Sequence, residues 1–308
     1  MRAPHAGALV VFRENRAVKA LAALVAATAV WGMTFVQVKD AVKLYPLFAF
    51  LAVRFVLATA TLAVPGASRL ASLGARGVRA AALLGGLLAV GYALQTAGLE
   101  RTTVSGTGFI TGMYVVLTPL IAVVAVRASI SRWTWAGVAL ATAGLAMLAG
   151  IHAGSASGDL LVLGAAAVYS LQIVLMERFA PLYDPVAFTL VEMAAAASGL
   201  LVVAAVHGDL TTPHGWTVWG ALLVTGIFAS ALAFLVQTWA QQRTSATRTA
   251  LAFTLEPVWA ALFGYTLSGD RLGALGWGGC AAIMAGILLA EPAAGAALVS
   301  AVASRGRR

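Results

Sequence analysis

Four short sets that each combine an aromatic side chain with an amide or a hydroxyl recur along the chain at helical spacing. In each set an aromatic residue is followed three and four positions later by the other two members, so all three lie on one face of a helix. Aromatic faces can stack on an apolar group, and amides can hydrogen-bond a polar one. The pattern therefore predicts a shared site for a molecule with an apolar body and a polar head. The sets are Trp31, Thr34 and Phe35; Tyr92, Gln95 and Thr96; Tyr169, Gln172 and Ile173; and Phe234, Gln237 and Thr238.

The amides in these sets have a second interpretation, in which they hydrogen-bond neighbouring helices and never touch a ligand. For any single Gln both interpretations stay open. Four matched sets favour a common cavity, to which we add Tyr114 as a further substrate-binding candidate.

Three ionisable residues, Arg54, Glu192 and Glu256, lie within strongly apolar stretches. Charges in such surroundings are expensive, so they are functional candidates. Arg54 offers a planar donor fork to a carboxylate, unless it forms a structural pair or bonds backbone carbonyls. Glu256 can receive an ammonium group or a proton, unless it caps local backbone donors near Pro257. We count Glu256 among the predicted substrate-binding residues.

Enzymatic chemistry finds little support in the sequence. The four histidines, His5, His152, His207 and His214, lie in tails or polar connections, and neither Gly-x-Ser-x-Gly nor His-Glu-x-x-His occurs. The single Cys280 excludes an internal disulfide and a cysteine-rich metal site. We expect a non-enzyme with no catalytic residues, no bound metal and no cofactor.

The elements that carry these residues are those of a membrane protein. Hydrophobic residues make up 61% of the chain and charged residues 10%, whereas a soluble domain needs about a quarter charged. The net charge of +9 is scattered, which argues against a nucleic-acid partner. Ten apolar stretches approach the roughly 20 residues that span a bilayer as a helix. They lie near 17–38, 46–65, 78–99, 104–125, 133–151, 158–178, 184–206, 216–239, 245–268 and 273–291.

The basic residues predict the orientation in the membrane. With the N-terminus in the cytoplasm, 15 of the 20 Lys and Arg residues fall on the cytoplasmic side, four on the other, and Arg54 within a stretch. This bias follows the positive-inside rule. We predict an all-α integral membrane protein with ten transmembrane helices, both termini cytoplasmic, in a cell membrane, the bacterial inner membrane.

The two halves of the chain repeat each other. Gln-Thr, four residues and Arg-Thr occur at Gln95 and again at Gln237, 142 positions apart, and "VWGMTF" from Val30 matches "VYSLQI" from Val168 at 138. Each half holds five stretches, an odd number, so the second copy must be inverted in the membrane. We place the five-helix repeats at 1–152 and 153–308. Pro119 and Pro257 also match at 138 and are predicted hinges, since proline weakens a helix.

Inverted repeats favour transport, because exchanging the shapes of the two halves moves a midplane site from one side to the other. The alternatives are a duplicated bundle that only adds stability, and a membrane receptor or scaffold that transports nothing.

Several landmarks resemble the EamA-type exporters of the drug/metabolite transporter superfamily, and the length and the "WGMTF" opening are similar to YddG-type aromatic amino acid exporters. The resemblance covers about 17–291 and is carried by Trp31-Gly32, Arg54-Phe55, Pro119, Pro257, Gly137, Gly144, Gly279 and Gly286. It implies export of amino acids, aromatic ones among them, or of other small amphipathic metabolites or drugs.

Two departures from that pattern limit what can be carried over. The Gly-Glu pair usual before the last helix of a repeat is Gly269-Asp270 in the second half and Ala128-Ser129 in the first. Small multidrug relatives place a coupling glutamate in the first helix, where this chain has no acid before Asp40. That scheme of proton coupling is therefore not carried over.

The fifth and tenth stretches have faces of small residues and are predicted to be peripheral. Such faces allow close approach of a neighbour, either within the bundle or in a homodimer. They comprise Gly137, Ala141 and Gly144, and Gly279, Ala282 and Gly286.

Overall fold

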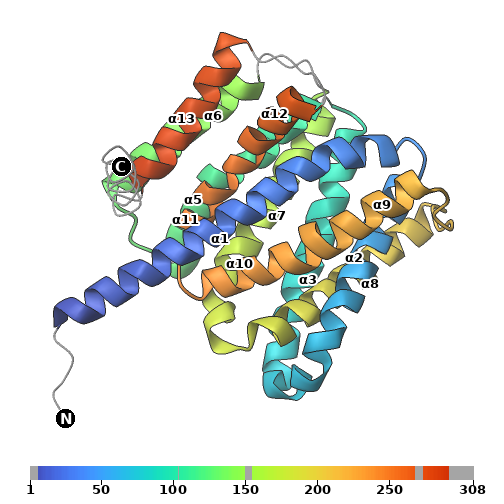
Figure 1. Ribbon diagram of the computed structural model, residues 1–308, viewed down its shortest axis with the longest axis horizontal. Helices are drawn as coiled ribbons and strands as arrows, with labels where there is room; N and C mark the ends of the chain where they lie inside the picture. The colour runs from blue at the N-terminus through green and yellow to red at the C-terminus, as the bar shows by residue number, and fades with distance from the viewer. Residues whose placement is uncertain (1–5, 103, 150–154, 268–272, 291–308) are drawn as a thin grey trace, which may run out of the picture.

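Figure 1 shows the computed structural model of the chain, which describes residues 6–102, 104–149, 155–267 and 273–290. Within these ranges every regular element is a helix. The first half forms α1 (Ala6–Ala41), α2 (Leu47–Gly66), η1 (Ala67–Leu73), α3 (Gly74–Leu99), α4 (Val104–Gly112), α5 (Tyr114–Val126) and α6 (Arg132–Ala149). The second forms α7 (Ala156–Phe179), η2 (Ala180–Leu182), α8 (Pro185–Val206), α9 (Trp216–Val224), η3 (Thr225–Leu232), α10 (Ala233–Gln241), α11 (Ala246–Phe253), α12 (Leu255–Leu267) and α13 (Ala274–Ala290).

Five helical stretches in the described part of the chain are long and apolar enough to cross a membrane. Each predicted apolar stretch overlaps one helix or several helices in line, because an apolar backbone segment without water must satisfy its own hydrogen bonds. The five stretches are Leu47–Leu99, Thr107–Val126, Ala156–Leu182, Pro185–Val206 and Trp216–Gln241.

Helices α6 and α13 lie side by side at one edge of the structure and contact each other through their small faces (Figure 1). A Cβ on Gly144 would lie 2.6 Å from the Gly279 carbonyl oxygen, and a Cβ on Gly279 equally close to that of Gly144. Gly137 and Gly286 oppose each other in the same reciprocal way. Since Gly137 corresponds in sequence to Gly279, and Gly144 to Gly286, these equivalent helices run antiparallel about a two-fold axis. The repeats are thus inverted, and these small faces are covered within the chain.

The central helices follow the same symmetry. Helix α2 packs on its repeat counterpart α8, and α3 packs on α7 just as α10 packs on α1. Contacts of α1 with α12 are likewise matched by contacts of α7 with α5. One buried cluster accordingly contains Phe55 and Leu88 from the first half with Met193 and Phe234 from the second. The halves interlock, so a site at their boundary draws on both.

Two helices predicted as single spans are broken near their middle. The break between α11 and α12 at Thr254 fits Pro257, which lacks the N–H that would bond the Phe253 carbonyl. The first-half break, at Met113, falls six residues before Pro119, which lies inside α5. Proline chemistry therefore accounts for the second break only.

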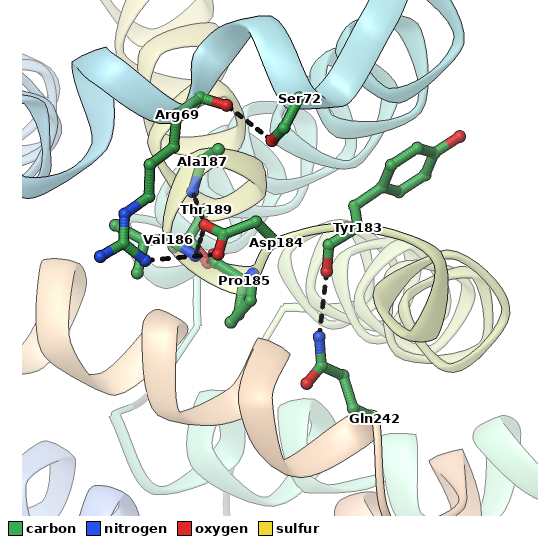
Figure 2. Close-up of polar contacts among 9 residues, drawn as sticks. All are labelled: Arg69, Ser72, Tyr183, Asp184, Pro185, Val186, Ala187, Thr189 and Gln242. Atoms are coloured by element: carbon green, nitrogen blue, oxygen red, sulfur yellow. Dashed lines mark hydrogen bonds and ion pairs between the residues drawn. The ribbon is translucent and has the colours of Figure 1, made fainter.

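A polar corner joins η1, the start of α8 and the end of α10 (Figure 2). Asp184 caps α8, since its Oδ1 accepts hydrogen bonds from the backbone N–H groups of Val186 (3.1 Å) and Ala187 (3.0 Å). Its Oδ2 lies 3.3 Å from Nη1 of Arg69, whose side chain is 52% exposed. Such an exposed pair stabilises little, so the cap is the stronger determinant of where α8 begins.

Adjacent glycines in α3 offer a matched test of the α3–α8 packing. A Cβ on Gly85 would collide with the backbone carbonyl of Glu192, whereas a Cβ on Gly86 would meet nothing within 4 Å. We expect Gly85→Ala to lower the free energy of unfolding by about 1–3 kcal/mol through overpacking. Gly86→Ala should be neutral or stabilising by up to about 1 kcal/mol. Thermal unfolding in detergent checks both, and equal shifts in Tm would contradict the packing.

Candidate functional site

Aromatic rings from both repeats meet at the centre of the bundle. Trp31 of α1 contacts Phe253 and Phe234, with ring centroids 5.0 and 5.8 Å apart. Tyr92 of α3 contacts Tyr169 of α7 edge-on at 5.6 Å. The structure therefore brings together rings that the sequence predicted for one site, and Tyr114 joins them through Phe253 at 6.2 Å. The side chain of Phe35 lies outside the described residues.

Two rings of this cluster were missed by the sequence analysis. Phe55 lies 5.1 Å from Tyr92 and 6.3 Å from Phe234, and Phe253 touches both Trp31 and Tyr114. Phe55 follows Arg54 directly, and Phe253 lies four residues before Pro257. Proximity to those residues was the available indication.

Gln95 links three helices beside the rings. Its Nε2 donates to the Thr111 hydroxyl at 2.9 Å, and its Oε1 accepts from the Tyr169 hydroxyl at 3.3 Å. Tyr92, Gln95 and Tyr169 are each only partly buried, although they lie on inward faces. These three side chains therefore keep some accessible surface although their helices pack on each other.

The other predicted amides form a closed network. Gln172 donates to Glu192 Oε1 at 2.8 Å, and Gln237 donates to the side-chain oxygens of Gln172 (3.2 Å) and Gln241 (3.0 Å). Gln241 in turn donates to the Ile173 carbonyl. All four side chains are at most 2% exposed. In this conformation Gln172 and Gln237 hold α7, α8 and α10 together, which is the structural interpretation that the sequence left open.

The predicted hydroxyls also bond within the protein. Thr34 donates to the Trp31 carbonyl at 2.7 Å. Thr238 donates to the Phe234 carbonyl and accepts from Thr189 at 2.9 Å. Thr34, Thr96 and Thr238 are all buried.

Arg54 is anchored to an unusual segment of the opposite repeat. Its Nε donates to the Ser230 hydroxyl at 2.7 Å, and one Nη lies 3.4 Å from the Ala229 carbonyl, which also accepts from the Trp31 indole at 2.6 Å. Ser230 and Ala229 belong to η3, a π-helix, a form that often marks functional sites. The guanidinium also lies 5.7 Å from the Tyr92 ring centroid, within cation–π range.

Glu256 is the second residue of α12, just after the helix break, and is partly exposed. Its carboxyl group interacts electrostatically with Arg54, Tyr92, Tyr114 and Tyr169, so these groups face one region. Among the described residues its side chain has no hydrogen bond or ion pair. It does not cap the local backbone, and it is open to a ligand.

Helix α11 is packed into the predicted cytoplasmic end of the bundle. Seven of the eight residues of this helix are buried. Glu177 of α7 accepts a 2.7 Å hydrogen bond from the Ala246 N–H, and Ser245 caps the same helix. An open cavity of about 400 Å³ lies beside this contact, lined by Val126, Val174, Glu177 and Arg178. The sequence analysis missed Glu177, although the repeated Arg-Thr-Thr/Ser phrase ends at this cap.

The sequence profile described as "EamA-like transporter family" matches residues 18–150 and again 156–290. The chain belongs to this family. An uncharacterized transporter of Archaeoglobus fulgidus is 30% identical over 263 residues, which covers 84% of this chain and 82% of that protein. A solved crystal structure is similar with a TM-score of 0.76 over 90% of this chain and 97% of the other, and at 19% identity this likeness shows the fold alone.

The match confirms the resemblance at the level of the family and shows two copies of the repeat. It identifies this EamA-like protein as a multi-pass membrane transporter, a class distinct from enzymes. Membership of the family does not specify the substrate, which depends on the side chains of the site.

The buried amide network predicts different roles for the two repeated glutamines. Gln237→Leu would leave Gln172 and Gln241 without a buried donor, and we expect it to lower the free energy of unfolding by about 1–3 kcal/mol. Gln95→Leu should cost less, because Gln95 and its partner Tyr169 are partly exposed. Thermal unfolding of both variants in detergent measures this, and a larger loss for Gln95→Leu would contradict the network.

Proposed function

We propose that this EamA-like transporter exports amino acids, aromatic ones among them, or similar small amphipathic metabolites by alternating access. The observation that carries this proposal is the set of partly exposed Tyr92, Gln95 and Tyr169, together with Trp31, where the two inverted repeats meet. Aromatic faces suit an apolar or aromatic side chain. Several modest contacts also allow both binding and release.

The proposed topology has ten spans, both termini in the cytoplasm and the bacterial inner membrane as the location. The bias of Lys and Arg to one side supports it. Exposed tryptophans near helix ends support it as well, since Trp and Tyr favour the membrane–water interfaces. They are Trp133 at the start of α6, Trp216 and Trp219 in α9, and Trp277 in α13.

Alternating access requires one end of the pathway to close while the other opens. Buried α11, held by Glu177, supports a state that is closed toward the cytoplasm. Broken helices are typical of transporter sites. Because α6 and α13 already cover each other's small faces, a homodimer through these helices would use their outer faces, where Leu140 and Met284 are exposed.

Export of other metabolites or drugs within the superfamily is the nearest alternative, and a receptor or scaffold that transports nothing is the alternative of another class. Reconstitution in liposomes with a panel of labelled amino acids, with and without a proton gradient, separates these functions. Flux of drugs or other metabolites without amino acid flux would support the first alternative, and no flux from well-folded protein would support the second.

A substitution on α3 tests whether the aromatic cluster belongs to the pathway. Tyr92→Ala removes a ring that contacts both Phe55 and Tyr169, and we expect it to lower the flux of labelled phenylalanine about tenfold. Val90→Ala is the control, because Val90 is 49% exposed on the same helix and should leave flux unchanged. Equal flux in the two variants would place the site elsewhere.

The closed end gives a prediction about the conformational equilibrium. Glu177→Ala removes the acceptor for the Ala246 N–H, so we expect the cytoplasmic end to open more often. Thr249→Cys, introduced in a Cys280→Ala background at a position with 0% exposure, reports this opening through labelling by an impermeant maleimide. Labelling should rise about tenfold with Glu177→Ala and less with Glu177→Gln, which keeps an acceptor oxygen. An unchanged rate would show that Glu177 does not hold this end closed.

A further inference from the structure

Two oppositely charged residues lie near the aromatic cluster without making contact with each other. Arg54 comes from the first repeat and Glu256 from the second, and they interact electrostatically but form no ion pair in the described part of the chain. Unpaired charges at membrane depth are costly, and most are neutralised by a direct partner. Something in the structure must therefore keep Arg54 and Glu256 from forming an ion pair.

The cause on the Arg54 side is its anchorage. The bond from Nε to Ser230 and the contact of one Nη with Ala229 tie the guanidinium to η3. The adjacent Tyr92 interacts with it through both ring and hydroxyl. A guanidinium carries five N–H donors, so these contacts leave donors on Arg54 without an acceptor among the described residues.

On the Glu256 side the cause is the packing of α12 on α1. A Cβ at Gly32 would lie 2.5 Å from the Trp259 Cβ and 3.0 Å from the Glu256 carbonyl oxygen, so the two backbones are in direct contact. This contact fixes the first turn of α12. Glu256 is thereby held in place, partly exposed and without a hydrogen-bond partner among the described residues.

The unbonded N–H donors of Arg54 and the carboxylate of Glu256 indicate which charged groups a ligand would carry. Arg54 can accept a carboxylate and Glu256 an ammonium, because charge-assisted hydrogen bonds of this kind are the strong ones. A molecule that carries both groups would satisfy both residues at once, whereas a singly charged molecule would leave one of them unpaired. The free-energy cost of leaving a buried polar group without a partner exceeds the net free energy that a typical hydrogen bond contributes. The neighbouring rings of Tyr92 and Trp31 would then take the apolar part of the ligand.

We propose that Arg54 and Glu256 form a split-charge site that selects zwitterions with a free α-carboxylate and a free α-ammonium group. This inference rests on the proposed function and narrows it, since it assigns recognition of the polar head to the two charges. The amides predicted for that task are largely bonded to protein groups. Amino acid esters, amides and N-acylated derivatives would be discriminated against.

The test uses the full-length protein in proteoliposomes, with labelled L-phenylalanine as the probe. Phenylalanine amide lacks the carboxylate, and N-acetylphenylalanine lacks the ammonium. In the wild type we expect each to compete about tenfold or more less strongly than unlabelled phenylalanine. Arg54→Gln should abolish the preference over the amide only, and Glu256→Gln should abolish the preference over the N-acetyl derivative only.

Matched controls are Arg69→Gln and Glu100→Gln, exposed residues that should keep both preferences. Arg54→Lys keeps the charge and should retain part of the preference for a free carboxylate. Because Arg54→Gln also removes bonds to η3, stabilisation of the protein by each ligand is measured as a shift of Tm in detergent, which needs no flux.

The outcomes separate this inference from the proposed function. If wild-type protein carries phenylalanine but binds the amide and the N-acetyl derivative equally well, the split-charge site is wrong while amino acid transport stands. The same holds if the variants keep both preferences. If phenylalanine is neither carried nor stabilises the protein, and the other amino acids of the panel also fail, both proposals are overturned.

Discussion

Polar groups in the interior of a bilayer find no water, so every amide, hydroxyl and charge of this chain must find a partner inside the bundle or face an internal space. This constraint turns the rare polar residues inward and decides which helices touch. Gln172, Gln237, Gln241 and Glu192 hydrogen-bond one another across three helices, although Oε2 of Glu192 has no partner. Among the charged groups of the described residues, Glu256 and part of Arg54 also lack a hydrogen-bond partner, and both lie where the repeats meet.

The inverted repeat places the same polar motif in both halves of the chain. In this conformation the two copies have different surroundings. Gln95 is partly exposed and bonds Thr111 and Tyr169, while its counterpart Gln237 is buried in a network. Equivalent sequence in unequal surroundings is what alternating access would produce, because the two halves must hold different shapes at any moment. The other conformation would place the Gln237 side in the more open arrangement.

Much of the architecture could be read from the sequence, since it depends on local or periodic properties. Apolar length located the helices, and the two-fold relation followed from repeats such as Gly137 and Gly279. Side-chain partners were harder to predict, because periodicity shows which face of a helix points inward but not how deeply each side chain is buried. Gln95 and Gln237 have the same spacing and different burial. The break at Met113 and the π-helix η3 have no sequence marker comparable to Pro257.

One inequality between the repeats concerns the ends of the pathway. Glu177 places a carboxylate at the N-terminus of α11, where the helix dipole favours negative charge. The position 138 residues earlier, matched by the repeat, holds Lys39, a cation. A cation would not supply the stabilisation of about 0.3–1 kcal/mol that a carboxylate has at a helix N-terminus. The start of α11 therefore carries a stabilising charge that the matched sequence position does not supply. In the proposed alternating-access cycle, this difference between the two halves would favour a resting state that is closed toward the side that carries Glu177.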